Sequence, residues 1–351
     1  MLLLRHQQFS LPFHHPFTIA KGTKTQQPTL IVSLASGPIF GLGEAPAISY
    51  YDETIESMMA SVEKVRGVIE RYALMDPQRF WHFLHHLIPG QSFLTAALDM
   101  ASWDFFGRMR RKPLWQLIGA KWEAVPVTDL TIGLDTPKAM LQKIAERPWP
   151  VYKIKLAQPE DIDILRTLRA ATAAPFRVDM NEGWNYDDTL RLLPELQKLD
   201  VVLIEQPLPK AASEEMKALK AQSHIPLIAD EACQVEADVA KCAEGFHGIN
   251  IKLTKCGGIT PALRMIAEAR QRGLKVMLGS MNESSIGSAA LAHLAPLADY
   301  LDADGPLLLA QDVADGLRYN EDGSVQVSAA PGLGIRYFGE ARSSNPFASA
   351  Q

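Results

Sequence analysis

The residues best suited to chemistry in this sequence are lysines and carboxylates that lie within or at the ends of short β-type runs. They occur one or two per run, as Lys153 and Lys155, Asp179, Glu205, Asp230, Lys252, and Asp302 and Asp304. Carboxylates can hold a hard cation, and a suitably placed lysine can move a proton. The pattern therefore indicates metal-assisted proton transfer, provided that the fold brings these residues together.

Three of the carboxylates, Asp179, Glu205 and Asp230, come from three successive runs. Clustered carboxylates repel one another unless a cation lies between them. Ligands that are all oxygen, with no His or Cys nearby, favour Mg²⁺, with Mn²⁺ as the alternative, over zinc. A single acid after a strand is about as often a helix N-cap, but three in series facing lysines are better explained as a metal site.

The lysines are placed for acid and base chemistry. Lys153 and Lys155 alternate with Ile154, so both project from the same face of one strand. Two adjacent ammonium groups disfavour each other's protonation, which predicts a pKa closer to neutrality. Lys252 lies four runs later, roughly across a barrel, so that a base and an acid would face opposite sides of a substrate. Lys255, by contrast, is interpreted as a solvated lysine at a helix start.

Eight apolar runs must position these residues, and their starts are separated by 22 to 27 residues. They begin at Val125, Val151, Phe176, Val201, Pro226, Gly248, Lys275 and Tyr300, with helical patterns between them. Eight such units predict a TIM-type (β/α)-barrel of the α/β class, whose active site lies at the C-terminal ends of its strands. An open doubly wound sheet fits less well, because no G-x-G-x-x-G follows the first strand.

The first 120 residues have a mixed pattern and predict an α+β capping domain. Residues 29–35 and 39–45 have β-type sequences, whereas residues 52–72 and 92–108 carry apolar residues at helical spacing. Residues 121–320 are assigned to the barrel. Residues 321–351 are predicted to form a turn-rich tail that packs back on the capping domain.

Bulk properties exclude several classes of protein. The net charge of −5 argues against a nucleic-acid surface, and the three cysteines are too scattered for a disulfide framework. No stretch reaches the roughly 18 apolar residues of a membrane span. We expect a cytoplasmic protein that binds a small molecule and neither nucleic acid nor membrane.

Together these motifs resemble the enolase superfamily, and within it the muconate-lactonizing-enzyme subgroup. The resemblance covers nearly the whole chain, through the Gly41-x-Gly43-Glu44-Ala45 turn, residues 97–107, the K-x-K pair, the stretch from Asn250 and residues 331–335. It implies a modified (β/α)7β barrel, often assembled as a homo-oligomer. It also implies Lys155 and Lys252 as the acid/base pair and Asp179, Glu205 and Asp230 as Mg²⁺ ligands. Lys153 would tune Lys155 and contact the substrate carboxylate.

The segment Asp302-Ala303-Asp304 resembles the D-x-D motif of dipeptide epimerases such as the L-Ala-D/L-Glu type, in which two acids hold the α-ammonium. Two carboxylates on one face pair well with one ammonium group. The resemblance implies epimerisation of a dipeptide by removal and return of the α-proton through an enediolate. A turn or helix cap is the alternative role for the two acids, which Gly305-Pro306 would permit.

Several further residues match substrate-lining positions of the resemblance, namely Thr131, Ser280, Met281 and Asn282. Ser280 replaces a typical Cys, and Asn282 is more polar than is usual there. The loop at residues 18–24 has a family-typical position and carries Lys21 and Lys24. Either lysine could recognise a second substrate carboxylate.

Other functions share some of these features. Muconate cycloisomerase and o-succinylbenzoate synthase use the same lysines and metal acids, but their substrates lack an ammonium group for Asp302 and Asp304. A non-catalytic binding barrel would not need the acid/base set. A Schiff-base barrel would need one lysine and no three-carboxylate site.

Two other motifs are set aside. His82, His85 and His86 have helical spacing but no acidic partner, so they predict a helix face and not a zinc site. Cys233 lacks the paired His that a catalytic thiol requires.

Overall fold

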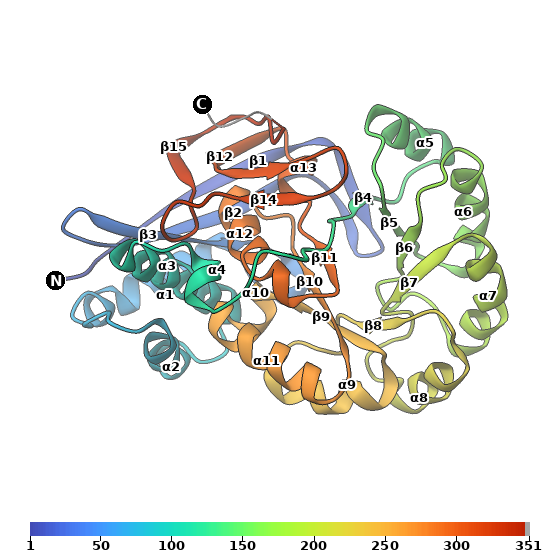
Figure 1. The fold of residues 1–351 in the computed structure, drawn as a ribbon, viewed down its shortest axis with the longest axis horizontal. Helices are drawn as coiled ribbons and strands as arrows, with labels where there is room; N and C mark the ends of the chain where they lie inside the picture. The colour runs from blue at the N-terminus through green and yellow to red at the C-terminus, as the bar shows by residue number, and fades with distance from the viewer. Residues whose placement is uncertain (348–351) are drawn as a thin grey trace.

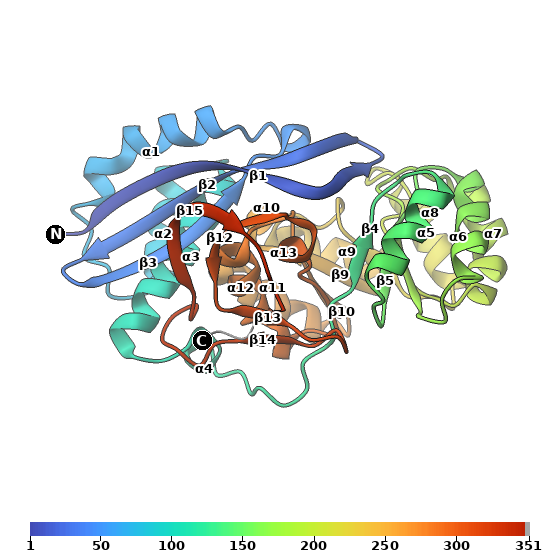
Figure 2. The same ribbon diagram turned by 90° about the horizontal axis from the view of Figure 1, so that it is seen from above.

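The computed structural model describes residues 1–347, which form a capping domain, a barrel and a C-terminal tail (Figure 1). Seen from above, the hairpin of the first two strands extends from the capping domain towards the first barrel strands (Figure 2). No helix within the described range is both long and apolar enough to cross a membrane.

The capping domain combines a three-stranded antiparallel meander with helices. The strands are β1 (Leu3–Ile19), β2 (Gly22–Ser36) and β3 (Ile39–Pro46), and the helices are η1 (Ser49–Tyr51), α1 (Ile55–Ile69), α2 (Pro77–Leu87), α3 (Ser92–Arg110) and α4 (Leu114–Leu117). The predicted strands and helices are therefore present. The length of β1 was not predicted, because polar residues such as those at 5–8 and 14–15 interrupt the apolar alternation that indicates a half-buried strand.

The eight predicted barrel strands are all present and lie in sequence order in one parallel sheet. They are β4 (Leu130–Ile132), β5 (Tyr152–Lys155), β6 (Phe176–Asp179), β7 (Val201–Glu205), β8 (Leu227–Ala229), β9 (Gly248–Lys252), β10 (Lys275–Gly279) and β11 (Tyr300–Asp302). The first and last strands meet because Thr128 forms a parallel bridge with Leu301. The sheet is thereby closed into the predicted barrel.

Helices follow the strands on the outside of the barrel. They are η2 (Pro159–Asp161), η3 (Glu236–Asp238), η4 (Ala295–Leu297), α5 (Pro137–Glu146), α6 (Ile162–Arg169), α7 (Tyr186–Lys198), α8 (Ser213–Gln222), α9 (Val239–Gly245), α10 (Leu253–Cys256), α11 (Ile259–Gln271), α12 (Ser285–Ala292) and α13 (Gly305–Leu308). Only the four-residue α13 follows the last strand. The barrel therefore has the modified (β/α)7β form.

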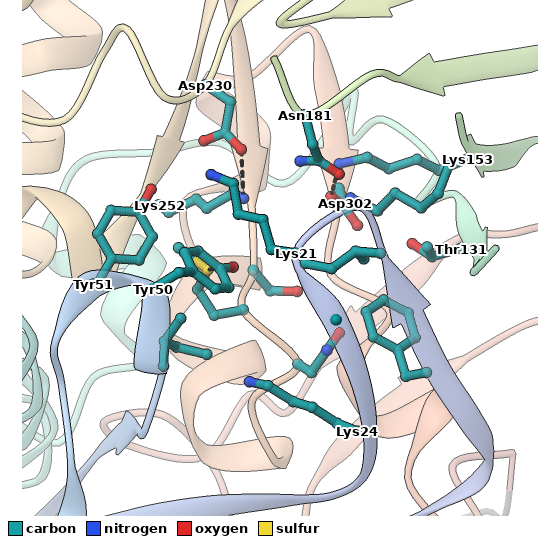
Figure 3. Close-up of a pocket in the computed structure, with 18 of the residues that line it drawn as sticks. Lys21, Lys24, Tyr50, Tyr51, Thr131, Lys153, Asn181, Asp230, Lys252 and Asp302 are labelled. Atoms are coloured by element: carbon teal, nitrogen blue, oxygen red, sulfur yellow. Dashed lines mark hydrogen bonds and ion pairs between the residues drawn. The ribbon is translucent and has the colours of Figure 1, made fainter. Parts of the chain in front are cut away.

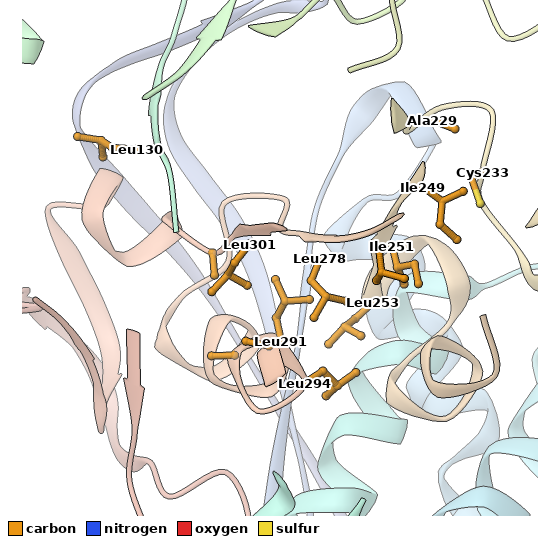
Figure 4. Packing of buried hydrophobic residues seen from close by; sticks show 14 of the residues in the cluster. Leu130, Ala229, Cys233, Ile249, Ile251, Leu253, Leu278, Leu291, Leu294 and Leu301 are labelled. Carbon is orange, nitrogen blue, oxygen red and sulfur yellow. The ribbon is translucent and has the colours of Figure 1, made fainter. Parts of the chain in front are cut away.

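Side chains that alternate along the barrel strands belong to two groups: apolar residues in the core between strands and helices, and polar residues in the barrel interior. Ile249 and Ile251 of β9 are buried in the apolar cluster that also holds Leu278, Leu291 and Leu301 from neighbouring elements (Figure 4). Successive side chains of a strand point to opposite faces of the sheet. Asn250 and Lys252 consequently point to the barrel interior, where they are buried as well.

Strand register aligns the ionisable residues in rows. Lys155, Asp179 and Glu205 are register partners across β5, β6 and β7. On the other side of the barrel, Lys252 and Asp302 both pair with Gly279 of β10. Register partners lie at the same height along their strands, so each row forms one layer of the barrel mouth.

The Gly41-x-Gly43 segment was named as a turn in the resemblance, which is wrong. Both glycines lie within β3, as the β-type sequence of residues 39–45 predicted. A Cβ atom on Gly41 would meet the carbonyl oxygen of Ala101 at 2.0 Å, and one on Gly43 would meet that of Ala97 at 1.9 Å. The glycines therefore let the α3 backbone approach the sheet closely.

Two buried carboxylates of the capping domain connect it to barrel helices. Glu44 of β3 accepts hydrogen bonds from the amides of Ser284 and Gly287, both at 3.0 Å, at the start of α12. Asp99 of α3 accepts from the amide of Thr260, at 2.9 Å, at the start of α11. Amides at a helix N-terminus have no partner within the helix and favour negative charge, so these contacts hold the two parts in register.

Residues 321–351 were predicted to form a turn-rich tail, but the chain after Asp304 also contains short strands. These are β12 (Gln311–Asp315), β13 (Leu317–Tyr319), β14 (Val325–Val327) and β15 (Arg336–Ser343). β15 pairs with β12, and the hydroxyl of Tyr337 donates to Gln7 Oε1 in β1 at 3.0 Å. The tail thus contacts the capping domain as well as the end of the barrel segment.

The β3–α3 contact generates a stability prediction. We expect Gly43→Ala to destabilise the protein by about 1–3 kcal/mol or more, because the added methyl group overlaps a backbone carbonyl. Gly67→Ala is the control, since a Cβ there meets nothing within 4 Å on the exposed side of α1. That control should be neutral or stabilising by up to about 1 kcal/mol. Unfolding in urea measures both, and equal midpoints for the two variants would contradict the close contact.

Candidate active site

A pocket lies at the C-terminal ends of the barrel strands, beneath the β1–β2 hairpin (Figure 3). Every residue predicted as an acid/base group or substrate contact lines it: Lys21, Lys24, Thr131, Lys153, Lys155, Lys252, Ser280, Met281, Asn282, Asp302 and Asp304. Asp230 also lines it, whereas Asp179 and Glu205 are fully buried beside it. The structure therefore brings all the sequence-predicted residues to one place.

The three predicted metal ligands form a compact cluster. Each of Asp179, Glu205 and Asp230 offers an oxygen, and these oxygens lie within 4.8 Å of one another. Burial raises the pKa of Glu205 to about 7, and the nearby Asp179 carboxylate adds to this effect. Glu205 Oε2 accepts no hydrogen bond, although Lys153 Nζ lies 2.8 Å away. A buried cluster of three carboxylates, which offers only oxygen ligands, fits a hard divalent cation such as Mg²⁺.

Lys153 and Lys155 both project into the barrel, as predicted. Lys155 Nζ lies 2.5 Å from Asp179 Oδ2, and Lys153 Nζ lies 2.7 Å from Asp302 Oδ2. Burial favours the neutral form of Lys153, but the carboxylates of Asp302 and Glu205 outweigh it and hold its pKa well above the usual value. The expected near-neutral pKa is therefore wrong for Lys153, because the carboxylates around it, and not Lys155, dominate its surroundings.

Lys252 lies across the pocket from Lys153 (Figure 3). Its Nζ is 2.7 Å from Asp230 Oδ2. β5 and β9 are four strands apart in the sheet of eight, which places them on opposite sides of the closed barrel. The two predicted acid/base lysines thus approach the pocket from opposite directions, and each contacts a different acid of the cluster.

Lys255 was interpreted as a solvated lysine, and this is wrong. It is buried in the one-turn helix α10, and its Nζ lies 2.5 Å from Asp230 Oδ1. β9 ends at Lys252, and the following helix α10 places Lys255 against Asp230, where it is shielded from solvent. The signal that could have identified Lys255 is its place three residues after Lys252, about one helical turn away.

Asp302 and Asp304 lie side by side with Asp129 beneath the pocket, and oxygens of the three lie within 4.8 Å of one another. Asp304 Oδ2 accepts a hydrogen bond from the amide of Thr131 at 2.6 Å. Burial raises the pKa of Asp304 to about 7, with a contribution from Asp302. In Asp302, by contrast, Lys153 outweighs burial and lowers the pKa.

Asp129 and its partner Arg177 were missed by the sequence analysis. Arg177 Nη1 lies 2.8 Å from Asp129 Oδ2, and both residues are buried inside the barrel. Thr131, Lys153 and Arg177 are register partners on three adjacent strands. The inward position of Lys153 was therefore the available signal for Arg177.

The β1–β2 hairpin brings two lysines over the pocket. Lys21 Nζ lies 3.5 Å from carboxylate oxygens of both Glu182 and Glu231, and 4.9 Å from the centre of the Tyr50 ring. Lys24 Nζ donates to Gln27 Oε1 at 3.3 Å, and burial lowers the pKa of Lys24. The two lysines thus have different surroundings, which the sequence did not reveal.

Other residues that line the pocket were not among the predicted site residues. They are Phe17, Ile19, Gly22, Thr23, Ile48, Ser49, Tyr50, Tyr51, Asn181 and Glu231. Asn181 and Glu231 lie within two residues of predicted metal ligands, which was a usable signal. Tyr50 and Tyr51 reach the pocket only through the packing of the capping domain on the barrel, which no local pattern reports.

The turns after the strands have unusual backbone geometry. Asn181 has a φ of 43°, Gln206 of 34° and Asn282 of 67°, all in the left-handed region. A non-glycine residue there carries strain that surrounding contacts must offset. The Gln206 side chain makes such contacts, because its Oε1 accepts from the amides of Asp230 and Ala232, both at 3.0 Å.

The residues set aside lie outside this pocket. His82, His85 and His86 are exposed on α2, and none belongs to a potential metal-ligand group within residues 1–347. Cys233 is buried and does not line the pocket.

Comparisons with known proteins agree with this geometry. Residues 5–119 match the mandelate racemase/muconate lactonizing enzyme N-terminal domain, and residues 137–341 match the enolase C-terminal domain-like family. The L-Ala-D/L-amino acid epimerase of Flavobacterium johnsoniae is 44% identical over 334 residues, which cover 95% of this chain and 98% of that protein. The L-Ala-D/L-Glu epimerase of Bacteroides thetaiotaomicron is 33% identical, over 93% and 86% of the two chains.

Solved structures show the same relationship. A dipeptide epimerase from Cytophaga hutchinsonii, complexed with Mg and D-Ala-L-Val, superposes with a TM-score of 0.91 at 25% identity, over 96% of both chains. One from Methylococcus capsulatus, complexed with Mg and L-Arg-D-Lys, gives 0.89 at 32% identity, over 96% of this chain and 99% of that one. The resemblance seen in the sequence is thereby confirmed, and the chain belongs to the mandelate racemase and muconate-lactonizing-enzyme family of the enolase superfamily.

Proposed function

We propose that this protein is an isomerase that epimerises dipeptides, with the L-Ala-D/L-amino-acid class as its substrates. One observation carries the proposal: Lys155 and Lys252 reach a single pocket from opposite sides of the barrel, and each contacts a different acid of the three-carboxylate cluster. Two such groups are what removal of a proton from one face and its return to the other require. The names of the similar proteins support the same reaction.

Asp179, Glu205 and Asp230 are the residues that would hold Mg²⁺, or Mn²⁺ in its place. When bound, the cation supplies electrostatic stabilisation of the negative charge that develops on the substrate carboxylate as the α-proton leaves. It would also satisfy the buried Glu205 oxygen that accepts no hydrogen bond. The neighbouring structures that contain Mg support this assignment.

The lysines divide the proton transfers between them. For one configuration of the C-terminal residue, Lys155 Nζ takes the α-proton and Lys252 Nζ delivers one to the opposite face. For the other configuration the two roles are exchanged. Lys153 stays protonated among its carboxylate neighbours, so it acts as a fixed cation for the substrate carboxylate and not as a base.

The free ammonium of the substrate is assigned to Asp302 and Asp304. Both line the pocket, and Asp304 makes no ion pair with any lysine or arginine in residues 1–347. We therefore expect the substrate ammonium to form its ion pair mainly with Asp304. Asp304 also disfavours the cycloisomerase alternatives, since their substrates would leave this buried acid without a cation.

Substrate side-chain preference is assigned to the hairpin lysines. Lys21 already lies near the carboxylates of Glu182 and Glu231, whereas Lys24 has, within residues 1–347, only the neutral Gln27 as its hydrogen-bond partner. We therefore assign recognition of an acidic substrate side chain to Lys24. Ser280, Met281 and Asn282 would line the remaining space.

Two expectations from the sequence stay predictions. These are a homo-oligomeric assembly and a cytoplasmic location. Light scattering of the purified protein, and fractionation of cells that produce it, would test them.

The acid/base assignment predicts stereospecific behaviour of two variants in ²H₂O. Lys155→Ala and Lys252→Ala should each lower epimerisation by about 10³-fold or more, because one proton transfer is lost. Each should still exchange the α-proton of one C-terminal configuration, and the two variants should prefer opposite configurations. Mass spectrometry and NMR of L-Ala-L-Leu and L-Ala-D-Leu measure this. Near-full epimerisation by either variant would contradict the proposal.

The ammonium assignment predicts a selective binding defect. Asp304→Asn should raise the KM of L-Ala-L-Leu by about 30-fold, equivalent to about 2 kcal/mol for a lost charge partner. Binding of N-acetyl-L-Ala-L-Leu, which has no ammonium, should change far less. Isothermal titration with both ligands provides the comparison, and equal losses would refute the role of Asp304.

The hairpin assignment predicts different effects for the two lysines. Lys24→Ala should lower kcat/KM for L-Ala-L-Glu about tenfold relative to L-Ala-L-Leu, because a charge-assisted contact is lost. Lys21→Ala is the matched variant on the same hairpin and should not produce this selective loss. If Lys21→Ala alone were selective, the assignment would have to be reversed.

A further inference from the structure

Lys255 lies behind the pocket, and its ammonium group is enclosed by oxygen atoms of the protein. Its side chain is 1% exposed. Four oxygens surround Nζ: Asp230 Oδ1 at 2.5 Å, Asp230 O at 2.6 Å, Cys233 O at 2.9 Å and Asn250 O at 3.3 Å. An ammonium group has three N–H donors, so all of them are used within the protein. Lys255 is therefore held in one geometry and is not available to a substrate.

Asp230 is shared between two lysines. Lys252 contacts Oδ2 and lines the pocket, whereas Lys255 contacts Oδ1 and does not line it. Lys255 thus holds the carboxylate from behind, on the side away from the substrate. The contact with Oδ1 fixes the side-chain rotamer and keeps Oδ2 directed at the pocket.

The same ammonium also holds the backbone around Asp230. It joins the carbonyl groups of Asp230 and Cys233, which follow β8, to that of Asn250 in β9. Pairing between β8 and β9 ends at Ala229, one residue before Asp230. Lys255 therefore replaces the strand pairing that is missing where the carboxylate must be positioned.

The capping domain holds α10 in place. Gly257, which ends α10, has a φ of 92°, and its carbonyl accepts a hydrogen bond from Trp81 Nε1 of α2 at 2.8 Å. A Cβ on Gly258 would meet Asp99 Oδ2 of α3 at 2.4 Å. The short helix that carries Lys255 is thus packed tightly against two helices of the capping domain.

We infer that Lys255 is a positioning residue for Asp230 and thereby sets the divalent-cation affinity of the site. The inference rests on the proposed function, since that function assigns Asp230 to the metal site. Outer contacts that orient a metal ligand commonly contribute about 10- to 100-fold to affinity. The positive charge of Lys255 has the opposite effect, because by itself it repels a cation. Removing Lys255 therefore distinguishes the two effects: cation affinity falls if positioning of Asp230 dominates and rises if charge repulsion dominates.

The test measures Mn²⁺ binding to the metal-free full-length protein by electron paramagnetic resonance, without substrate. Lys255→Met should raise the Kd by about 10- to 100-fold, and Lys255→Gln, which keeps an N–H donor, should raise it less. Lys220→Met is the control, because Lys220 makes one hydrogen bond, to Ala243 O, away from the site. The control should bind Mn²⁺ as the unaltered protein does.

A second readout separates positioning from a general structural role. In Lys255→Gln the Mg²⁺ concentration for half-maximal activity should rise, and kcat at saturating Mg²⁺ should recover most of its value. Unchanged or tighter Mn²⁺ binding by folded Lys255→Met or Lys255→Gln would overturn the inference, as would a lower kcat with an unchanged Mg²⁺ requirement. Should Lys255→Met fail to fold, Lys255→Gln alone decides. If the unaltered protein bound Mn²⁺ but exchanged no α-proton of any dipeptide, only the proposed function would fail.

Discussion

Charge compensation in the barrel mouth is the constraint on which the rest of this structure depends. Three carboxylates, Asp179, Glu205 and Asp230, are buried where their oxygens lie within 4.8 Å of one another. Burying one such charge without a partner is strongly unfavourable, and burying three together is more so. Lysines from β5, β9 and α10 contact them, and a divalent cation would complete the balance. Two of the lysines that compensate these charges, Lys155 and Lys252, also line the pocket and are the proposed acid/base groups.

The capping domain depends on this arrangement and also completes it. Its β1–β2 hairpin carries Lys21 to within 3.5 Å of Glu231, directly beside a proposed metal ligand. Glu44 and Asp99 meet the N-termini of barrel helices α12 and α11. These buried acids replace water at helix amides, so the capping domain packs on the barrel without leaving those backbone donors unsatisfied. In the proposed function, Lys24 of the capping domain contacts the substrate side chain, whereas the acid/base lysines belong to the barrel.

Predictions that depend on local sequence patterns agreed with the structure, whereas two predictions that depend on contacts between distant residues did not. Strand periodicity predicted every barrel strand, since alternation and spacing are local properties that the barrel preserves. Lys255 was misjudged because its burial arises from α10 folding back onto Asp230, a contact 25 positions away in sequence. The protonation of Lys153 was misjudged for a similar reason: its nearest charge in sequence is Lys155, but its nearest charges in space are Asp302 and Glu205.

The sequence by itself determined the order of the ionisable residues on the strands and the face of each strand on which they lie. The face depends only on the two-residue period of a strand, which needs no tertiary information. The proposed chemical role of each residue came from its type and from the resemblance to the enolase superfamily. Only the tertiary structure decided which charges are paired. It separated Lys21, which lies near two glutamates, from Lys24, and it joined Asp129 to Arg177 beneath Asp302 and Asp304. Pairing depends on distances across the barrel and from the capping domain, and electrostatic interactions between buried groups change steeply with those distances.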